Sequence, residues 1–188
     1  MGKYLKRAHK LDLQKLDNQW FALQVKCGRE TMCAQILRYK GYEEFLPLGI
    51  VGVCGRPTLA PTQRWPLFPG YLFCRLSAHV YGPIVTTPGV IRVLGCGGIP
   101  SPVSEAEIEN LQRLVDSNHP TSRWPYVALG QLVRITRGAL SGLTGKLVRV
   151  KNTHRLIVSI DLLLRSVATE LDAESVATAN FVGAYRAN

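Results

Sequence analysis

The residues of this chain that could do chemistry are its histidines and cysteines. The four histidines are isolated, and none has a cysteine or carboxylate at a spacing typical of metal ligands. They are His9, His79, His119 and His154. The five cysteines form no C-x-x-C pair, so we expect free thiols in a reducing cytoplasm. They are Cys27, Cys33, Cys54, Cys74 and Cys96. Because no serine, cysteine or carboxylate pair has a recognisable base beside it, we predict no catalytic site, metal or cofactor.

A glycine-rich stretch after residue 130 raises the question of a phosphate-binding loop. Gly145 and Lys146 resemble the end of such a loop, in which glycine amides cradle phosphates. The match fails, because Leu140 stands where the first glycine belongs and Leu147 where a serine or threonine belongs. The glycines of this stretch suit a tight connection between two strands instead.

Aromatic side chains gather in the segment Arg64–Phe73, where prolines and Gly70 exclude a helix. The residues that follow the turn alternate as a strand, Tyr71–Leu76. One face of this strand carries Leu72, Cys74 and Leu76, and the other carries Tyr71, Phe73 and Arg75, next to Phe68. A strand that served only a core would not usually place aromatics on its second face, so we predict a docking surface. The alternative is that these aromatics pack under a helix of their own domain.

Composition places the chain among soluble globular proteins. It has 188 residues, of which 46% are hydrophobic and 19% charged, enough for two small domains or one medium domain. No apolar run approaches the roughly 20 residues of a membrane span, and Met1–Lys15 lacks the apolar region of a secretory signal. The net charge of +10 favours a polyanionic partner, most simply nucleic acid. Composition alone equally allows a soluble basic surface.

Hydrophobic periodicity predicts an α+β chain. A basic tail, residues 1–17, precedes a domain at 18–116 in which strands and helices follow the order β-α-β-β-(α)-β-α. This order suggests an antiparallel sheet covered by helices. Pro120 and Pro125 indicate a linker at 117–128. Short strands and turns at 129–178 then predict a small barrel, and 179–188 form a second tail.

The glycine-punctuated stretch of the predicted barrel is similar to a KOW motif. Together with Phe68-Pro69-Gly70-Tyr71, Trp20-Phe21 and Pro88-Gly89-Val90, it makes the chain resemble the NusG family of transcription factors over about residues 20–178. The resemblance implies an N-terminal NGN domain with a ferredoxin-like antiparallel sheet and flanking helices. It also implies a C-terminal KOW domain, a small SH3-like β-barrel.

The resemblance further implies where partners bind. The NGN domain would dock on the clamp helices of the largest RNA polymerase subunit through Phe68, Pro69, Tyr71 and Phe73. Non-template DNA would pass Lys26, Arg29 and Arg38. In the KOW domain, Leu140 and Leu143 would engage Rho or a small-subunit ribosomal protein, although loop leucines tucked into the barrel are equally consistent with the sequence.

The segment Ile160–Ala168 departs from housekeeping NusG, where a glycine is expected near its centre. Its leucine run favours helix as much as strand and resembles operon-specific paralogues, including RfaH-like and polysaccharide-operon antiterminators. The glycines of the preceding loop each oppose a helix by about 1 kcal/mol, so we predict a folded barrel. The function predicted is a monomeric, non-enzymatic elongation or antitermination factor that modulates pausing and termination. The alternative is a ribosome- or RNA-binding KOW protein acting in translation.

Overall fold

The computed structural model describes residues 18–50, 64–76, 81–96, 99–124, 126, 131–150, 153–171 and 179–184. The predicted basic tail 1–17, with His9, lies outside the described residues, as do Cys54 and His79. The described chain divides into two compact units. The first unit comprises residues up to 46 and from 68 to 105, and the second comprises those from 47 to 67 and from 106 onward.

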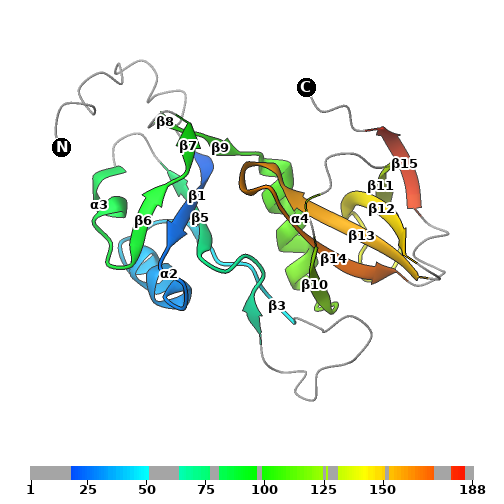
Figure 1. The fold of residues 1–188 in the computed structure, drawn as a ribbon, viewed down its shortest axis with the longest axis horizontal. Coiled ribbons are helices and arrows are strands. Elements are labelled where there is room, and N and C mark those ends of the chain that lie inside the picture. The colour runs from blue at the N-terminus through cyan, green and yellow to red at the C-terminus, as the bar shows by residue number, and fades with distance from the viewer. Residues whose placement is uncertain are drawn as a thin grey trace. The chain divides into compact units, whose positions relative to one another are not determined.

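The first unit is built on an antiparallel sheet with strand order β2-β5-β1-β6 (Figure 1). Its strands are β1 (Gln19–Val25), β2 (Glu44–Phe45), β5 (Tyr71–Leu76) and β6 (Val90–Val93), and β9 (Pro102–Val103) also pairs with β1. Two helices belong to this unit, α2 (Glu30–Tyr39) and α3 (Tyr81–Val85). A small hairpin joins β7 (Gly95–Cys96) to β8 (Ile99–Pro100).

One face of this sheet forms a continuous apolar core with both helices. The core holds Leu72 and Cys74 of β5 together with Cys33 and Leu37 of α2 and Ile84 of α3, all fully buried. The alternation predicted for Tyr71–Leu76 is therefore confirmed, because the Leu/Cys/Leu face is the core face. Since both helices contribute to one cluster, they cover the same face of the sheet.

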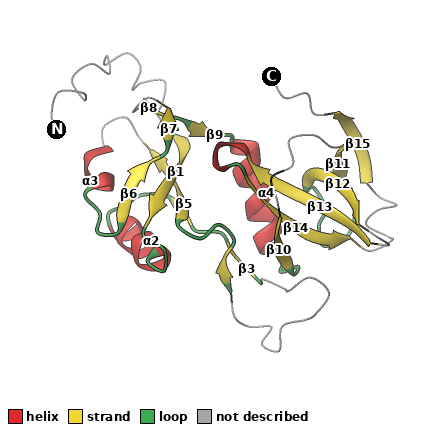
Figure 2. Cartoon of the chain, viewed as in Figure 1, coloured by secondary structure: helices red, strands yellow, loops and turns green. Residues whose placement is uncertain are grey.

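The second unit holds a six-stranded antiparallel sheet with order β10-β14-β13-β12-β11-β15. Its strands are β10 (Thr121–Trp124), β11 (Gln131–Ile135), β12 (Thr144–Val150), β13 (Thr153–Ile160), β14 (Arg165–Leu171) and β15 (Ala179–Ala184). The unit also contains α4 (Glu105–Asp116) from its second residue onward, and the strand pair β3 (Leu48–Gly49) and β4 (Trp65–Pro66). In the described chain, strands outweigh helices (Figure 2), and the predicted α+β class is confirmed.

Packing and pairing depart from the predicted domain limits in three places. Most of α4 groups with the second unit, whereas the sequence placed residues up to 116 in the first domain. The predicted linker contains β10, whose four residues pair with β14, and the predicted C-terminal tail contains β15, which pairs with β11. Pro120 directly precedes β10 without interrupting it; the four residues of β10 pair with β14, and the Thr121 N–H donates to the Ile50 carbonyl at 2.8 Å.

The leucine run after β13 forms the short connection between the paired strands β13 and β14 and does not form a long helix. Asp161–Leu163 make one 3-10 turn, and Leu164 follows in the left-handed region, with φ 48° and ψ 43°. Its side chain is 66% exposed. Leu164 therefore adopts the conformation that a glycine would adopt without steric cost, at the centre of the segment where a glycine was expected.

Among the residues that the structure describes, no helix has the length and apolar character needed to cross a bilayer.

Candidate functional site

The segment Phe68–Tyr71 forms a tight turn that leads into β5. The Tyr71 N–H donates to the Phe68 carbonyl at 3.0 Å, and Gly70 has φ +81°. Proline at the second position and glycine at the third, with positive φ, are typical of a type II turn. The residue types alone therefore fix the local path that presents Phe68 and Tyr71.

Two long-range hydrogen bonds hold this turn against the rest of the first unit. The Gly70 N–H donates to Glu30 Oε1 at 2.8 Å, and the Val25 N–H donates to the Gly70 carbonyl at 2.9 Å. Glu30 opens α2 and is only 4% exposed. Sequence analysis missed Glu30, because a glutamate in the first turn of a helix is ordinarily explained by the helix dipole.

The face of β5 opposite the core carries an aromatic cluster. The Phe73 ring stacks on Phe45 at a centroid distance of 6.2 Å and meets Phe68 edge-on at 6.3 Å. Phe68 and Phe73 are buried, with 1% and 0% of their surface exposed, and Tyr71 and Pro69 are half-buried. The predicted face is therefore aromatic, but the two phenylalanines are not exposed on it. Phe45, which lies on β2 opposite Phe73, was not identified from the sequence.

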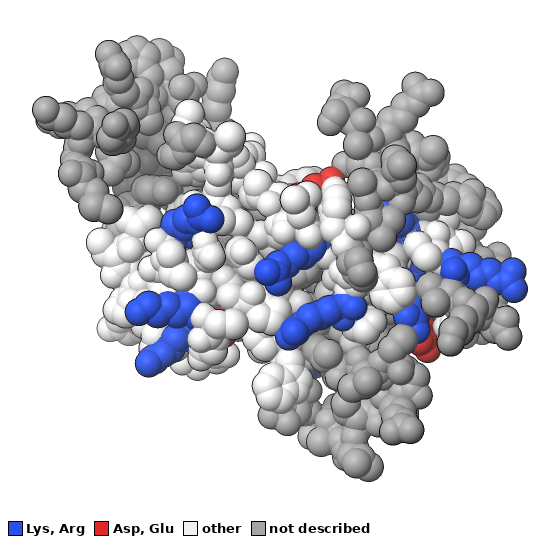
Figure 3. All heavy atoms as spheres, in the orientation of Figure 1, with Lys and Arg blue, Asp and Glu red and all other residues white. Residues whose placement is uncertain are grey.

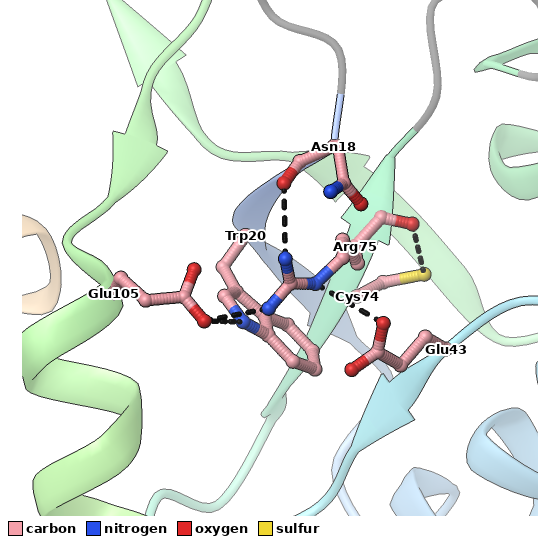
Figure 4. A network of polar contacts seen from close by, with 6 residues as sticks. All are labelled: Asn18, Trp20, Glu43, Cys74, Arg75 and Glu105. Atoms are coloured by element: carbon pink, nitrogen blue, oxygen red, sulfur yellow. Dashed lines mark hydrogen bonds and ion pairs between the residues drawn. The ribbon is translucent and has the colours of Figure 1, made fainter.

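Arg75 extends this face through a polar network (Figure 4). Its guanidinium lies 4.9 Å from the centre of the Trp20 ring and forms ion pairs with Glu105 at 2.6 Å and Glu43 at 3.1 Å. The guanidinium also donates to the Asn18 carbonyl at 3.2 Å, and Trp20 Nε1 donates to Glu105 Oε1 at 3.3 Å. These interactions join β1, the residue before β2 and the start of α4 around one cation, so Arg75 acts as a structural anchor of the face.

The cations predicted to contact DNA have two different environments in the structure. Lys26 follows β1, and its N–H donates to the Gly89 carbonyl at 2.8 Å. Arg29 precedes α2, and its Cβ lies 3.6 Å from where a Cβ of Gly89 would stand. Both therefore lie beside the Pro88-Gly89 turn. Arg38 instead pairs with the carboxylate of Glu44.

A further cation missed by sequence analysis lies near that turn. Arg92 is exposed on β6, opposite Gln24 of β1, and its Nε donates to Gln24 Oε1 at 2.8 Å. A neutral amide orients this arginine without neutralising it. Only the strand register reveals the pair, because 68 residues separate the two side chains.

The leucines predicted as a binding tip are buried. Leu140 and Leu143 lie in the loop between β11 and β12, with 3% and 0% of their surface exposed. The loop turns back on itself, since the Leu143 N–H donates to the Leu140 carbonyl at 3.0 Å. The sequence left open an exposed apolar tip or leucines packed inside. In the structure both leucines are buried.

The described thiols are all free, and two of them are exposed: Cys27 and Cys96. Burial raises the pKa of the Cys74 thiol to about 12, with smaller contributions from Glu44 and Glu43. Burial also raises the pKa of Cys33, whose Sγ donates to the Pro88 carbonyl at 3.4 Å. Within the described parts of the chain, no three histidine, cysteine, aspartate or glutamate side chains gather into a group that could hold a metal ion.

The family model described as "Transcription termination factor nusG" matches residues 18–112, half of the chain. The chain belongs to the NusG family. The matched residues contain the Phe68–Tyr71 turn, the aromatic face of β5 and the cations beside Pro88-Gly89. The first-unit part of the candidate site thus lies within the residues that match the family of transcription termination and antitermination factors, whereas Leu140 and Leu143 lie outside them.

Proteins named NusG are among those to which this chain is similar. The chain is 24% identical over 165 residues to the transcription termination/antitermination protein NusG of Helicobacter pylori strain 26695, covering 81% of this chain and 93% of that protein. It is 21% identical to the NusG of strain J99, with the same coverage. Among solved structures, "Domain interaction in Thermotoga maritima NusG" has a TM-score of 0.50 at 19% identity, covering 89% of this chain and 99% of that one. At this identity the structure supports the fold alone.

Proposed function

We propose that this NusG-family factor binds RNA polymerase through the aromatic face of β5 and thereby modulates pausing and termination without catalysing a reaction. The observation that carries the proposal is the arrangement of Phe68, Tyr71 and Phe73 on the face opposite the helix-covered core. Aromatic anchors beside a fixed turn are typical of binding hot spots. Pro69 completes the turn, and the clamp helices of the largest polymerase subunit are the proposed docking site.

Tyr71 is the side chain of this set best placed for direct contact. It is half-buried, whereas Phe68 and Phe73 are almost fully buried. A half-buried tyrosine on a rigid strand presents a large amphipathic surface at little entropic cost. We therefore assign Tyr71 the central contact and the two phenylalanines a supporting role.

Nucleic acid is the second proposed partner of this unit. Lys26, Arg29 and Arg92 form no ion pair within the described residues, and their backbones meet around the end of β1 and the start of β6. Cations on adjacent elements that no carboxylate neutralises can follow the phosphates of a single strand. Arg38 remains part of the proposal, but its pairing with Glu44 makes it the weakest contributor.

The second unit is proposed to bind Rho or a small-subunit ribosomal protein. Leu140 and Leu143 are buried, so direct contact of these two side chains with a partner requires the loop to rearrange.

We propose that the factor acts as a monomer in the cytoplasm. A purely translational role, as a ribosome- or RNA-binding protein, would leave the aromatic face of the first unit without a use.

The proposal is tested with full-length Tyr71→Ala in a binding assay with core RNA polymerase. We expect a loss of affinity of about tenfold, because truncating a hot-spot aromatic costs more than about 1 kcal/mol. The matched control is Tyr39→Ala, since Tyr39 is 94% exposed at the end of α2, in the same unit. Equal affinities of the two variants, both with unchanged melting temperatures, would refute the docking face. Transcription through a pause site then reports whether binding and pausing change together.

A further inference from the structure

The loop between β11 and β12 is held by a set of backbone hydrogen bonds. The Gly142 N–H donates to the Ile135 carbonyl at 2.8 Å, and the Ile135 N–H donates to the Leu143 carbonyl at 2.9 Å. The Ser141 N–H donates to the Gly138 carbonyl at 3.0 Å. The loop is therefore a fixed platform on the second unit.

Helix α4 presents a side chain to this platform. Asn110 Oδ1 accepts a hydrogen bond from the Thr144 N–H at 3.0 Å, which fixes the helix beside the end of the loop. Arg113 follows on the same side of α4, three residues later. Its guanidinium lies against Gly142, where a Cβ would stand only 2.8 Å from Arg113 Nη1. The absent side chain of Gly142, whose φ is +83°, thus makes room for this arginine.

Two more arginines lie at the base of the same platform. Arg134 is exposed on β11 opposite Thr144, and Arg137 is exposed just after the strand ends. Within the described residues, none of the three arginines has an ion pair, and the hydrogen bonds above bring their backbones to one place. Glu109 precedes Arg113 by one helical turn but forms no ion pair with it in this structure.

We propose that Arg113, Arg134 and Arg137, the arginine cluster, bind the phosphate groups of a nucleic-acid strand. A guanidinium presents a planar fork of donors that matches phosphate oxygens, and three of them around one loop form a multivalent anion site. The face drawn in Figure 3 also shows far more lysine and arginine surface than acidic surface. Because these interactions are with phosphates, binding is independent of base sequence. The cluster lies on the second unit and does not depend on polymerase docking.

The test is a titration of a short fluorescein-labelled single-stranded RNA, and of a DNA of the same sequence, followed by fluorescence anisotropy. The full-length protein carries Lys26→Gln, Arg29→Gln and Arg92→Gln throughout, so that the proposed DNA path of the first unit does not contribute. Adding Arg113→Gln, Arg134→Gln and Arg137→Gln should weaken binding at least tenfold. It should also lower the slope of log affinity against log salt by roughly 0.7 for each phosphate that is no longer neutralised.

Arg123→Gln is the matched control. Arg123 is exposed on β10, and β14, β13 and β12 separate β10 from β11 in the sheet. It should leave both affinity and salt slope unchanged. Equal losses for RNA and DNA would identify the shared phosphate backbone as the ligand, and a loss for only one would identify that nucleic acid as the ligand. An arginine-cluster variant that melts normally and binds like the Arg123→Gln control would overturn the proposal. Arg113→Lys should retain part of the affinity, since it keeps the charge but loses the fork.

Discussion

The carboxylate of Glu30 and the backbone N–H of Gly70 form a buried hydrogen bond of 2.8 Å between residues forty positions apart. Glu30 belongs to the first turn of α2, and Gly70 belongs to the turn before β5. The helix that covers the core face therefore also fixes the turn that leads to the aromatic face. The geometry of the aromatic face on one side of the sheet is thus coupled to helix packing on the other.

Removing the Glu30 acceptor should destabilise the first unit. Glu30→Ala leaves the Gly70 N–H unsatisfied in a buried position, which costs about 1–3 kcal/mol in the free energy of unfolding. Glu30→Gln keeps an oxygen acceptor and should cost less. Urea denaturation of both variants measures the difference. If the two variants lose the same stability, the hydrogen bond to Gly70 is not what makes Glu30 important.

The Pro69-Gly70 turn could be predicted from the sequence, whereas its hydrogen-bond partner Glu30 could not. Pro69 and Gly70 determine their own backbone angles, so the turn and the alternation of β5 follow from residue types alone. The partners of Gly70 and Arg92 depend on which strands and helices meet, and no local pattern records this. The aromatic face was therefore predictable, whereas Glu30 and Gln24 were not.

The linker prediction failed locally for a related reason. Pro120 is a valid strand breaker, and the sequence between it and Pro125 has no strong strand pattern of its own. The four residues of β10 become a strand because the edge of β14 offers partners, and because Thr169 Oγ1 donates to the Pro120 carbonyl at 3.1 Å. Pairing with a distant edge overrides weak local propensity.

Two aromatic side chains, one at the end of β10 and one just after it, should stabilise the folded second unit. Trp124 lies over the Arg155 guanidinium at 4.9 Å, and Tyr126 lies over Lys146 Nζ at 5.6 Å and donates to Asp161 Oδ1 at 3.0 Å. Tyr126→Phe should cost about 1.5–3 kcal/mol, because it removes a hydrogen bond to a carboxylate. Tyr126→Ala should cost more, since it also removes the ring over Lys146.

Urea denaturation measures these costs in the full-length protein. Arg123→Gln is the control, because an exposed substitution on β10, three residues before Tyr126, should change stability by less than about 0.5 kcal/mol. Unchanged stability of Tyr126→Ala would mean that the segment after β10 contributes nothing to the fold.

The buried thiols should differ sharply from the exposed ones in reactivity. The thiolate is the reactive form, and burial holds the pKa of Cys74 near 12 and raises that of Cys33. Peptide mapping after iodoacetamide treatment at neutral pH should show Cys27 and Cys96 labelled first. Cys33 and Cys74 should be labelled only when denaturant is added. Rapid labelling of Cys74 in the native protein would contradict its burial.

The same pKa shift predicts a loss of stability in alkali. A thiol with the ordinary pKa of 9.0 ionises in the unfolded chain, while Cys74 keeps its proton up to about pH 12. The unfolded state therefore loses the proton first, and the free energy of unfolding falls as pH rises between these two values. Cys74→Ala should be less stable at neutral pH, because it leaves a space in the core, but it should show a shallower decline in alkali. An equally steep decline in this variant would assign the alkaline loss to other groups.

Leu164 offers a direct measure of backbone strain. A leucine with φ 48° has a steric cost of roughly 1–2 kcal/mol that a glycine avoids. Glycine in turn loses more conformational entropy on folding, by about 0.4–1 kcal/mol, so Leu164→Gly should stabilise the protein by roughly 1 kcal/mol or less. Leu164→Ala is the matched control, because it removes the exposed side chain but keeps the strain, and it should leave stability nearly unchanged. Thermal unfolding of both variants separates the relief of backbone strain from the loss of the exposed side chain. A glycine variant no more stable than the alanine variant would show that the left-handed leucine is not strained.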